Sequence, residues 1–323
     1  MPATYGFSGR LNAEFPSQLN VDVSEICNLE CIHCPHPEFK KSEHYAARLL
    51  GPDLNKKVID EVATDGRGIC QYIRYTSEGE PLLHKLVFEM LTYAKKHSGT
   101  SITLTTNGVL LDEKRCEKLL ATGIDLVDIS LDAFTPETYA KIRVKGDLNI
   151  TRPNVQRLIE LAHGTGSQTK VVVSYIEQPQ NKLESDQFEK YWRDQGADQV
   201  VVRRMHSAAG AVGDLAAVLR SQLGTAARYP CLYPWERLCI NPRGELQYCP
   251  QDWVHGSALF DFRKITLKAA WQSEPYRALR EAHLKNDFSH HTFCGQCPDW
   301  AGTRWPGVGR SYANLVEEIK ASG

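Results

Sequence analysis

The chain has 323 residues, of which 42% are hydrophobic, enough to bury the core of one large domain with a smaller appendage. Its 38 basic and 39 acidic residues nearly cancel, which argues against a nucleic acid or an anionic membrane as the partner. The first residues, MPATYGFSGRLNAEF, show neither an apolar core nor a cleavage-site pattern, and no run approaches the roughly eighteen apolar residues of a membrane span. We therefore expect a cytoplasmic protein that enters no membrane.

From about residue 19 to 205, short β-branched runs alternate with amphipathic segments of helical period. The runs are LNVDVS, YIRYT, SITLTT, LVDIS, KVVVSYIE and QVVVRR. Such a succession of βα units predicts a parallel sheet covered by helices, in which the loops after the strands carry the chemistry. The expected fold class is α/β, a partial (β/α)6 barrel of the TIM type. The expected parts are an N-terminal extension (1–18), the barrel (19–215) and a smaller C-terminal unit (216–323).

Residues 205–230, rich in Ala and Gly, are predicted to form a connector. The segment WERLCINPRGELQYC then predicts a hairpin with a three-residue loop and a glycine, Gly244, in the left-handed position. Cys239 lies opposite Gln247 in this register. Cys239 and Cys249 then face the same side as diagonal neighbours, about 7–8 Å apart.

Three cysteines directly follow the first strand, Cys27, Cys31 and Cys34, in the spacing C-x3-C-x2-C. A structural zinc ion needs four ligands, so His33 or His36 would have to complete such a site. Three thiolates on one loop instead suit three corners of a 4Fe–4S cube, with the fourth iron open to an exogenous ligand. The spacing favours the cluster.

The other cysteines fall into two groups. Without a secretory signal, cysteines are more often metal ligands or reactive thiols than disulfides. Cys70 and Cys116 stand alone and are expected to be small buried apolar side chains. The remaining five lie close to the C-terminus: Cys231, Cys239, Cys249, Cys294 and Cys297.

The cysteine loop and the motifs after it resemble those of radical S-adenosylmethionine (SAM) enzymes, whose signature is C-x3-C-x-aromatic-C. His33 takes the aromatic position. SEGEPLLH resembles the family's Gly-Gly-Glu-Pro segment, with Glu78 in place of the first glycine. TLTTNG, DISLDA and ETYAKIR match further motifs in the family's order. The resemblance covers most of the chain and implies the same barrel.

The resemblance also implies that SAM is the missing fourth ligand, bound to the open iron of a 4Fe–4S cluster. Glu80 matches the carboxylate that receives the SAM ammonium group, and Arg143 matches an arginine that helps to hold the SAM carboxylate. Ser174 fits the position beside the ribose. The residues expected to bind SAM are His33, Ser77, Gly79, Glu80, Thr106, Asn107, Ser130, Asp132, Arg143 and Ser174. Cleavage of SAM would then give a 5′-deoxyadenosyl radical that takes hydrogen from the substrate.

The C-terminal cysteines resemble those of the SPASM or twitch extension of this family, in which four cysteines hold an auxiliary 4Fe–4S cluster. No cysteine follows Cys297, which favours the shorter twitch; a zinc ribbon is the alternative reading. One cysteine is left over, since either Cys239 or Cys249 can join Cys231, Cys294 and Cys297 as a ligand. The family spacing favours Cys249 as the ligand, whereas the polar segment PQDWVH after it suits a free thiol at a substrate.

Two redox outcomes are expected for a twitch-bearing enzyme. A dehydrogenase passes an electron from the substrate radical to the auxiliary cluster, and an epimerase returns hydrogen from a thiol to the opposite face. The additional cysteine favours an epimerase, with Cys249, or else Cys239, as the hydrogen donor. The chain resembles the radical SAM epimerases of aminoglycoside biosynthesis, which implies inversion at C5 of a terminal aminosugar, of the neomycin C to neomycin B type. A dehydrogenase of an aminocyclitol and a peptide-modifying SPASM enzyme are the alternatives.

A polycationic aminoglycoside requires carboxylates at the site, and Asp252, Glu236 and Asp299 lie in suitable segments. Ordinary surface charge or helix capping is the favoured explanation for any one of them. Four tryptophans are candidates for stacking on sugars or for core packing: Trp235, Trp253, Trp300 and Trp305. The expected redox partner is an external one-electron reductant of the flavodoxin or ferredoxin type.

Overall fold

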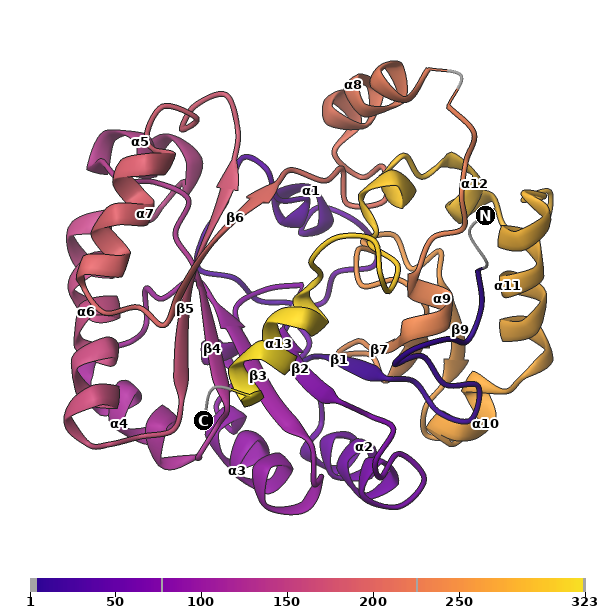
Figure 1. The fold of residues 1–323 in the computed structure, drawn as a ribbon, viewed down its shortest axis with the longest axis horizontal. Helices are drawn as coiled ribbons and strands as arrows, with labels where there is room; N and C mark the ends of the chain where they lie inside the picture. The colour runs from indigo at the N-terminus through magenta and orange to yellow at the C-terminus, as the bar shows by residue number, and fades with distance from the viewer. Residues whose placement is uncertain (1–4, 77, 225, 322–323) are drawn as a thin grey trace.

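The computed structural model describes residues 5–76, 78–224 and 226–321, and one sheet of nine strands runs through these residues (Figure 1). The strands lie in the order β6-β5-β4-β3-β2-β1-β7-β8-β9. Neighbours from β6 to β7 are parallel, and β8 and β9 are antiparallel additions. Their bounds are β1 (Gln18–Asp22), β2 (Tyr72–Thr76), β3 (Ser101–Thr106), β4 (Leu126–Ser130), β5 (Lys170–Glu177), β6 (Gln199–Arg204), β7 (Arg237–Ile240), β8 (Glu245–Gln247) and β9 (Ala258–Asp261). The predicted α/β class and partial barrel are confirmed.

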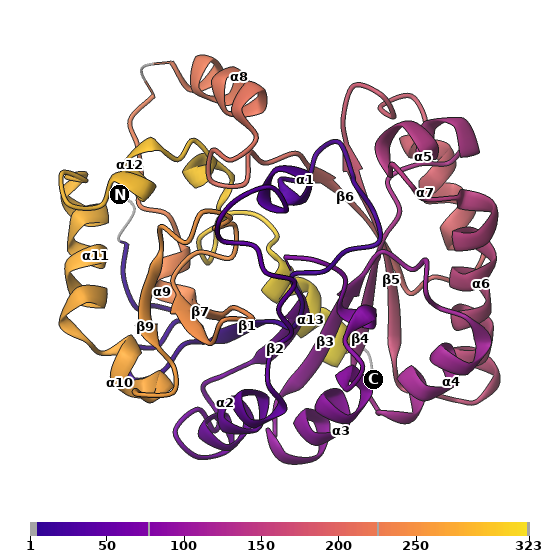
Figure 2. The same ribbon diagram turned by 180° about the vertical axis from the view of Figure 1, so that it is seen from behind.

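The helices form a layer on the outer face of the curved sheet. Figure 2 shows α2, α3, α4, α6 and α7 as an outer ring around β1 to β6. The helical elements are α1 (His36–Phe39), α2 (Pro52–Thr64), η1 (Pro81–Leu83), α3 (Val87–His97), α4 (Glu113–Ala121), α5 (Pro136–Ile142), α6 (Leu148–Gly164), α7 (Ser185–Asp194), α8 (Gly213–Leu223), α9 (Tyr233–Glu236), α10 (Leu267–Trp271), α11 (Glu274–Lys285), α12 (Thr292–Gln296), η2 (Asp299–Gly302) and α13 (Tyr312–Ala321). None of those described combines the length and apolar character that a bilayer crossing requires.

The predicted connector is only partly irregular, because it contains the helix α8. The residues between its glycines include good helix formers such as Ala and Leu, which accounts for this helix. The predicted connector therefore includes a helix over residues 213–223.

The predicted hairpin is confirmed in its register, with Cys239 opposite Gln247. Gly244 has a φ of +82°, the left-handed conformation that the turn requires. The sequence did not indicate that β7 also pairs in parallel with β1, which places Cys239 beside Asn20. The C-terminal unit therefore extends the sheet of the barrel.

The C-terminal helix α13 lies across the concave face of the sheet, in front of β2 and β3 (Figure 1). The rings of Tyr312 and Tyr72 are 5.6 Å apart, and Leu315 packs on Leu126 of β4. The Arg74 guanidinium lies 4.3 Å from the centre of the Tyr312 ring. The helix thus covers buried charged groups that point inward from the strands.

Asp128 of β4 is the centre of this buried charge. It is fully buried and accepts hydrogen bonds from Arg203 at 2.8 Å and from Arg74 at 3.4 Å. Burial raises its pKa, but the two guanidinium groups outweigh burial and hold the pKa of Asp128 below its usual value.

Replacement Asp128→Ala should therefore destabilise the protein, because it leaves two guanidinium groups without their shared partner. The expected loss is about 3–5 kcal/mol in the free energy of unfolding. The native interaction should be present at neutral pH and disappear as pH falls through the lowered folded-state pKa. Urea denaturation measures both effects.

Asp194→Ala is the matched control, since Asp194 pairs with Lys190 on the exposed surface of α7. It should cost no more than about 1 kcal/mol. Equal losses in the two variants would contradict a structural role for the buried cluster.

Candidate active site

The loop after β1 brings together the three cysteines that the sequence singled out. Burial raises the pKa of Cys27 and of Cys34 to about 12, and the Cys31 thiol nearby raises both further. Among the described residues, no three His, Cys, Asp or Glu side chains meet closely enough to hold a single metal ion. Three thiols that influence one another on one loop suit three corners of a four-iron cube.

The segment after β2 contacts this loop through its backbone. The backbone N–H of Glu80 donates to the carbonyl of Ile26 at 2.7 Å. A Cβ atom on Gly79 would lie 2.1 Å from the same carbonyl oxygen, so only glycine permits this close approach. The first glycine of the family motif is replaced by Glu78 and the second, Gly79, is kept. Ser77, also expected to bind SAM, lies outside the described residues.

Glu80 ties the ends of β2 and β3 together. Its carboxylate accepts hydrogen bonds from the Thr106 hydroxyl at 2.6 Å, from the Asn107 N–H at 2.8 Å and from the Leu82 N–H at 3.1 Å. The Asn107 side chain in turn donates to Asn28 within the cysteine loop at 2.8 Å. A carboxylate offers about four acceptor sites, so Glu80 retains one for a further donor. Sequence reasoning missed Asn28, because a lone asparagine in a loop carries no distinguishing signal.

Asp132 and Arg143 hold the other side of the loop. Arg143 donates to Asp132 at 2.5 Å and to the Cys31 sulfur at 3.7 Å. Burial lowers the pKa of Arg143, but Asp132 and Cys31 outweigh burial and keep it above its usual value. Asp132 has a φ of +62° and also accepts the Ile176 N–H at 2.7 Å. Arg143 was expected at the SAM carboxylate; its Nε is the nitrogen that has no partner among the described residues.

His33 lies 3.6 Å from Asp132 and 3.4 Å from the side chain of Gln178. Burial lowers its pKa to about 4, so the ring is neutral at neutral pH. His33 thus occupies the aromatic position of the signature as an uncharged ring.

The two serines expected at the SAM site end neighbouring strands. Ser130 of β4 lies opposite Ser174 of β5. The Ser174 hydroxyl donates to Asp128, the buried carboxylate described above. It is therefore available to a ribose only as an acceptor, a restriction that the motif alone did not show.

A second group of cysteines lines one small cavity in the C-terminal unit: Cys231, Cys249, Cys294 and Cys297. Burial raises the pKa of Cys294 to about 12 and of Cys297 to about 11. The Cys297 thiol also raises the pKa of Cys231 and of Cys249, which shows that these sulfurs are neighbours. The four thiols suit an auxiliary iron–sulfur cluster.

Cys239 lies apart from this cavity. It is 1% exposed on β7, between Asn20 of β1 and Gln247 of β8. After burial, Asp22 is the strongest influence that raises its pKa. The structure therefore does not bring Cys239 together with the other candidate ligands, whereas it does bring Cys249 to them.

The segment after Cys249 crosses from the hairpin to the SAM-binding side. The Trp253 ring lies 5.6 Å from Phe39 and 6.4 Å from His36, both in α1, directly after the three-cysteine loop. Asp252 holds this segment in shape by accepting hydrogen bonds from Ser257, through its N–H at 2.6 Å and its hydroxyl at 2.7 Å. The two cysteine regions are thus joined through residues 250–257.

The carboxylates proposed for a cationic substrate have internal partners. Glu236 pairs with Arg10 at 3.0 Å, and Asp299 accepts the N–H groups of Ser207 and Ala209 at 2.8 Å. The Asp252 carboxylate accepts its hydrogen bonds within its own loop, as described above. Three of the tryptophans are buried: Trp235, Trp300 and Trp305. Ion pairs and hydrogen bonds within the protein therefore explain the three carboxylates, and core packing explains the three tryptophans.

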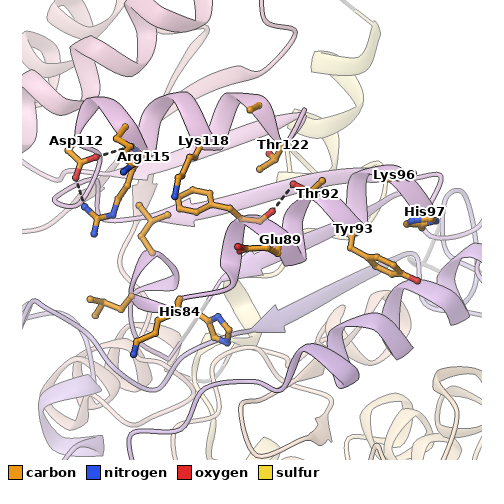
Figure 3. A pocket seen from close by; sticks show the side chains of 16 residues that line it. His84, Glu89, Thr92, Tyr93, Lys96, His97, Asp112, Arg115, Lys118 and Thr122 are labelled. Carbon is orange, nitrogen blue, oxygen red and sulfur yellow. Dashed lines mark hydrogen bonds and ion pairs between the residues drawn. The ribbon is translucent and has the colours of Figure 1, made fainter.

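A groove of about 910 Å³ lies on the outside of the barrel, between α3 and α4 (Figure 3). Polar side chains such as Glu89, Lys118 and Asp112 line it. It contains no cysteine and none of the residues expected to bind SAM. Because the groove lies on the outer helical layer, it is separate from both cysteine groups and from the residues expected to bind SAM.

Comparison with protein families agrees with this geometry. Residues 21–176 match the radical SAM superfamily, and residues 231–298 match the SPASM iron–sulfur cluster-binding domain. The chain carries a radical SAM domain and a SPASM domain. These two domains imply SAM and two 4Fe–4S clusters as cofactors.

Known proteins resemble this radical SAM chain in part. A probable GTP 3′,8-cyclase of Methanococcus maripaludis is 34% identical over 141 residues, which are 44% of this chain and 45% of that protein. The chain thus spans about half the length of this curated relative. The structure of Streptococcus suis SuiB with precursor peptide SuiA has a TM-score of 0.66 at 13% identity and covers 94% of this chain and 73% of SuiB. BtrN in complex with AdoMet and 2-DOIA has a TM-score of 0.57 at 16% identity, over 87% of this chain and 92% of BtrN.

These likenesses support the domains and the fold. They do not support the specific expectation of a neomycin epimerase, since the curated relative is named as a cyclase. The reaction therefore rests on residues particular to this chain.

Replacement Gly79→Ala should displace the three-cysteine loop, because the new methyl group meets backbone atoms of Ile26 that cannot rotate away. We expect a loss of stability of about 1–3 kcal/mol, with less iron bound at the SAM site. Thermal denaturation and iron analysis measure the two effects. Gly164→Ala, at a position with no atom within 4 Å of the new Cβ, should change neither.

Removal of one ligand from each cysteine group should remove one cluster at a time. Cys27→Ala and Cys297→Ala are each expected to lose about half of the bound iron, since each group is proposed to hold one of the two clusters. Cys116→Ala, a fully buried thiol outside both groups, should keep all of it. Iron content and electron paramagnetic resonance of the reduced protein give the measurement. Retention of all iron by Cys297→Ala would contradict the second site.

Proposed function

We propose that the chain is a radical SAM epimerase that inverts a ring carbon of an aminoglycoside. The specific reaction is inversion at C5 of the terminal aminosugar, as in the conversion of neomycin C to neomycin B. The observation that carries this proposal is the placement of Cys249, a half-buried thiol beside three other cysteines and directly before the polar segment that reaches α1. An oxidation needs only ligands for the auxiliary cluster and leaves one of the five C-terminal cysteines without a role, whereas an epimerisation requires a hydrogen donor.

When bound, the reduced cluster and SAM supply the 5′-deoxyadenosyl radical that removes a hydrogen atom from the substrate carbon. Cys249 then supplies hydrogen from the opposite face: its S–H bond breaks, a new C–H bond forms, and a thiyl radical is left on sulfur. One electron from an external reductant of the flavodoxin or ferredoxin type, together with one proton, restores the thiol. No bond from the carbon to oxygen or nitrogen breaks, so substrate and product are isomers.

Exposure favours Cys249 over Cys239 as the donor. A donor must touch the substrate carbon, and Cys239 is only 1% exposed within the sheet. With Cys249 as the donor, three thiols remain for the auxiliary cluster: Cys231, Cys294 and Cys297. This repeats the three-thiol arrangement of the loop after β1.

The solved relatives bear on the substrate class. BtrN was solved with 2-DOIA and SuiB with its precursor peptide, so the fold accommodates both kinds of ligand. The match covers 92% of BtrN and 73% of SuiB, which favours a BtrN-like substrate. A dehydrogenase acting on an aminocyclitol is the alternative from the same fold.

Anaerobic turnover of neomycin C with SAM and a reductant in D2O tests the proposal. The thiol proton exchanges with solvent, so the product should be an isomer of the substrate that carries one deuterium on carbon. Mass spectrometry and NMR read both properties. A product lighter by two hydrogen atoms would replace the epimerase by a dehydrogenase, and turnover of GTP instead of neomycin C would replace it by a cyclase.

Two variants separate the roles of the cysteines. Cys249→Ala should keep the iron of both clusters and still cleave SAM but form no deuterated epimer. Cys239→Ala should retain epimerisation. Loss of about half of the iron in Cys249→Ala would instead make Cys249 a cluster ligand and Cys239 the remaining candidate donor.

A further inference from the structure

Glu78 is a buried carboxylate without a partner. It follows β2 at the edge of the sheet that carries the three-cysteine loop, and it is 5% exposed. Neither of its carboxylate oxygens has a hydrogen-bond partner among the described residues. Buried carboxylates are normally paired, so this one calls for an explanation.

The surroundings of Glu78 are acidic. Burial raises its pKa well above the usual value, and Asp22, Glu25 and Asp252 raise it further, while Arg243 opposes them. Glu25 is already committed to Arg48 at 3.0 Å, and Asp252 to its own loop. These neighbours therefore give Glu78 no hydrogen-bond donor.

Two residues of β1 add further acceptors on the same side. Asn20 and Asp22 alternate with apolar residues and face the concave side of the sheet. Asn20 is 3% exposed, and its side-chain oxygen has no partner among the described residues. Burial raises the pKa of Asp22 to about 7, although Arg74 opposes this. This end of the sheet thus presents three buried side chains whose oxygen atoms can accept hydrogen bonds.

A ligand that complements these acceptors must bring positive charge and several donors. An ammonium group has both, with three N–H donors on one compact cation. A carboxylate or phosphate would add repulsion, and a neutral hydroxyl would supply a single donor.

We propose that Glu78, together with Asp22 and Asn20, binds an ammonium group of the substrate and selects for an aminosugar. This inference rests on the proposed function for the identity of the substrate and goes beyond it by assigning the residues that recognise it. Glu25 stands two residues before Cys27, and Asp252 stands three residues after Cys249. Because Glu78 interacts with both, an ammonium group held there is anchored between the two cysteine regions.

The test measures binding of neomycin C to the holoenzyme loaded with SAM, by calorimetry. Glu78→Gln keeps the shape of the side chain and removes the carboxylate that would pair with the ammonium group, so we expect the dissociation constant to rise roughly 10- to 100-fold. KM should rise by a similar factor. Glu89→Gln makes the same change on the exposed surface of α3 and should leave binding unchanged.

An analogue acetylated on the amino groups of the terminal ring provides a cross-check. The wild type should bind this analogue much more weakly than neomycin C. Glu78→Gln should discriminate far less between the two, because the charge that the amino group meets is gone. Equal discrimination by wild type and variant would overturn the assignment.

Stability separates recognition from a structural role. Glu78→Gln replaces an unpaired buried carboxyl group with a neutral amide, and folding then no longer has to bury an ionisable group. Its Tm should therefore equal or exceed that of the wild type, with iron content unchanged. A lower Tm together with lost iron would make Glu78 a structural residue and overturn the inference. If the wild type turns over neomycin C but binds it no more tightly than Glu78→Gln does, the inference fails and the proposed function stands. No binding by the wild type would defeat the proposed function as well.

Discussion

The parallel pairing of β1 with β7 is the constraint on which the arrangement of both cysteine regions depends. β1 leads directly into the three-cysteine loop, and β7 leads through the hairpin to Cys249. Paired strands lie about 4.8 Å apart and are fixed by their hydrogen bonds, so the two regions share one sheet and cannot drift independently. The segment after Cys249 then returns to α1 through Trp253, which makes a second connection on the side of the sheet where the chemistry lies.

Many of the polar side chains in the family motifs form hydrogen bonds with other residues of the protein. Glu80 fixes Thr106 and Asn107, while Asp132 fixes Arg143, which in turn touches Cys31. Such contacts orient the groups that hold a cofactor, and their loss would misplace a ligand without removing it. Motif residues therefore also position one another through these hydrogen bonds.

Local patterns in the sequence were sufficient for the six barrel strands and for the hairpin, because β-branched runs and the Asn-Pro-Arg-Gly turn carry their information within a few residues. The pairing of β7 with β1 could not be predicted in the same way, since residues such as Asn20 and Cys239 are more than two hundred positions apart and no local pattern links them. The alternation of the hairpin predicts that Cys239 and Cys249 share a side. It could not show which of them meets Cys294 and Cys297, because that depends on how the C-terminal helices fold back. The substitution of Glu78 for a motif glycine was visible, but its meaning required its burial and its lack of partners.

The two cysteine groups and Glu78 are buried groups whose charged forms cost free energy when no partner is bound. Burial raises the pKa of all seven thiols in the two cysteine groups, and Glu78 is left without a donor. Under the proposed function, iron would stabilise the six ligand thiolates and a substrate ammonium group would stabilise Glu78, while Cys249 stays a protonated thiol. The protein places Arg143 beside the first cysteine group and Arg228 beside the second, and each offsets the effect of burial only in part. Iron loading would therefore add to the stability of the folded protein. On this proposal, cofactor assembly, substrate recognition and folding are linked through buried thiol and carboxyl groups.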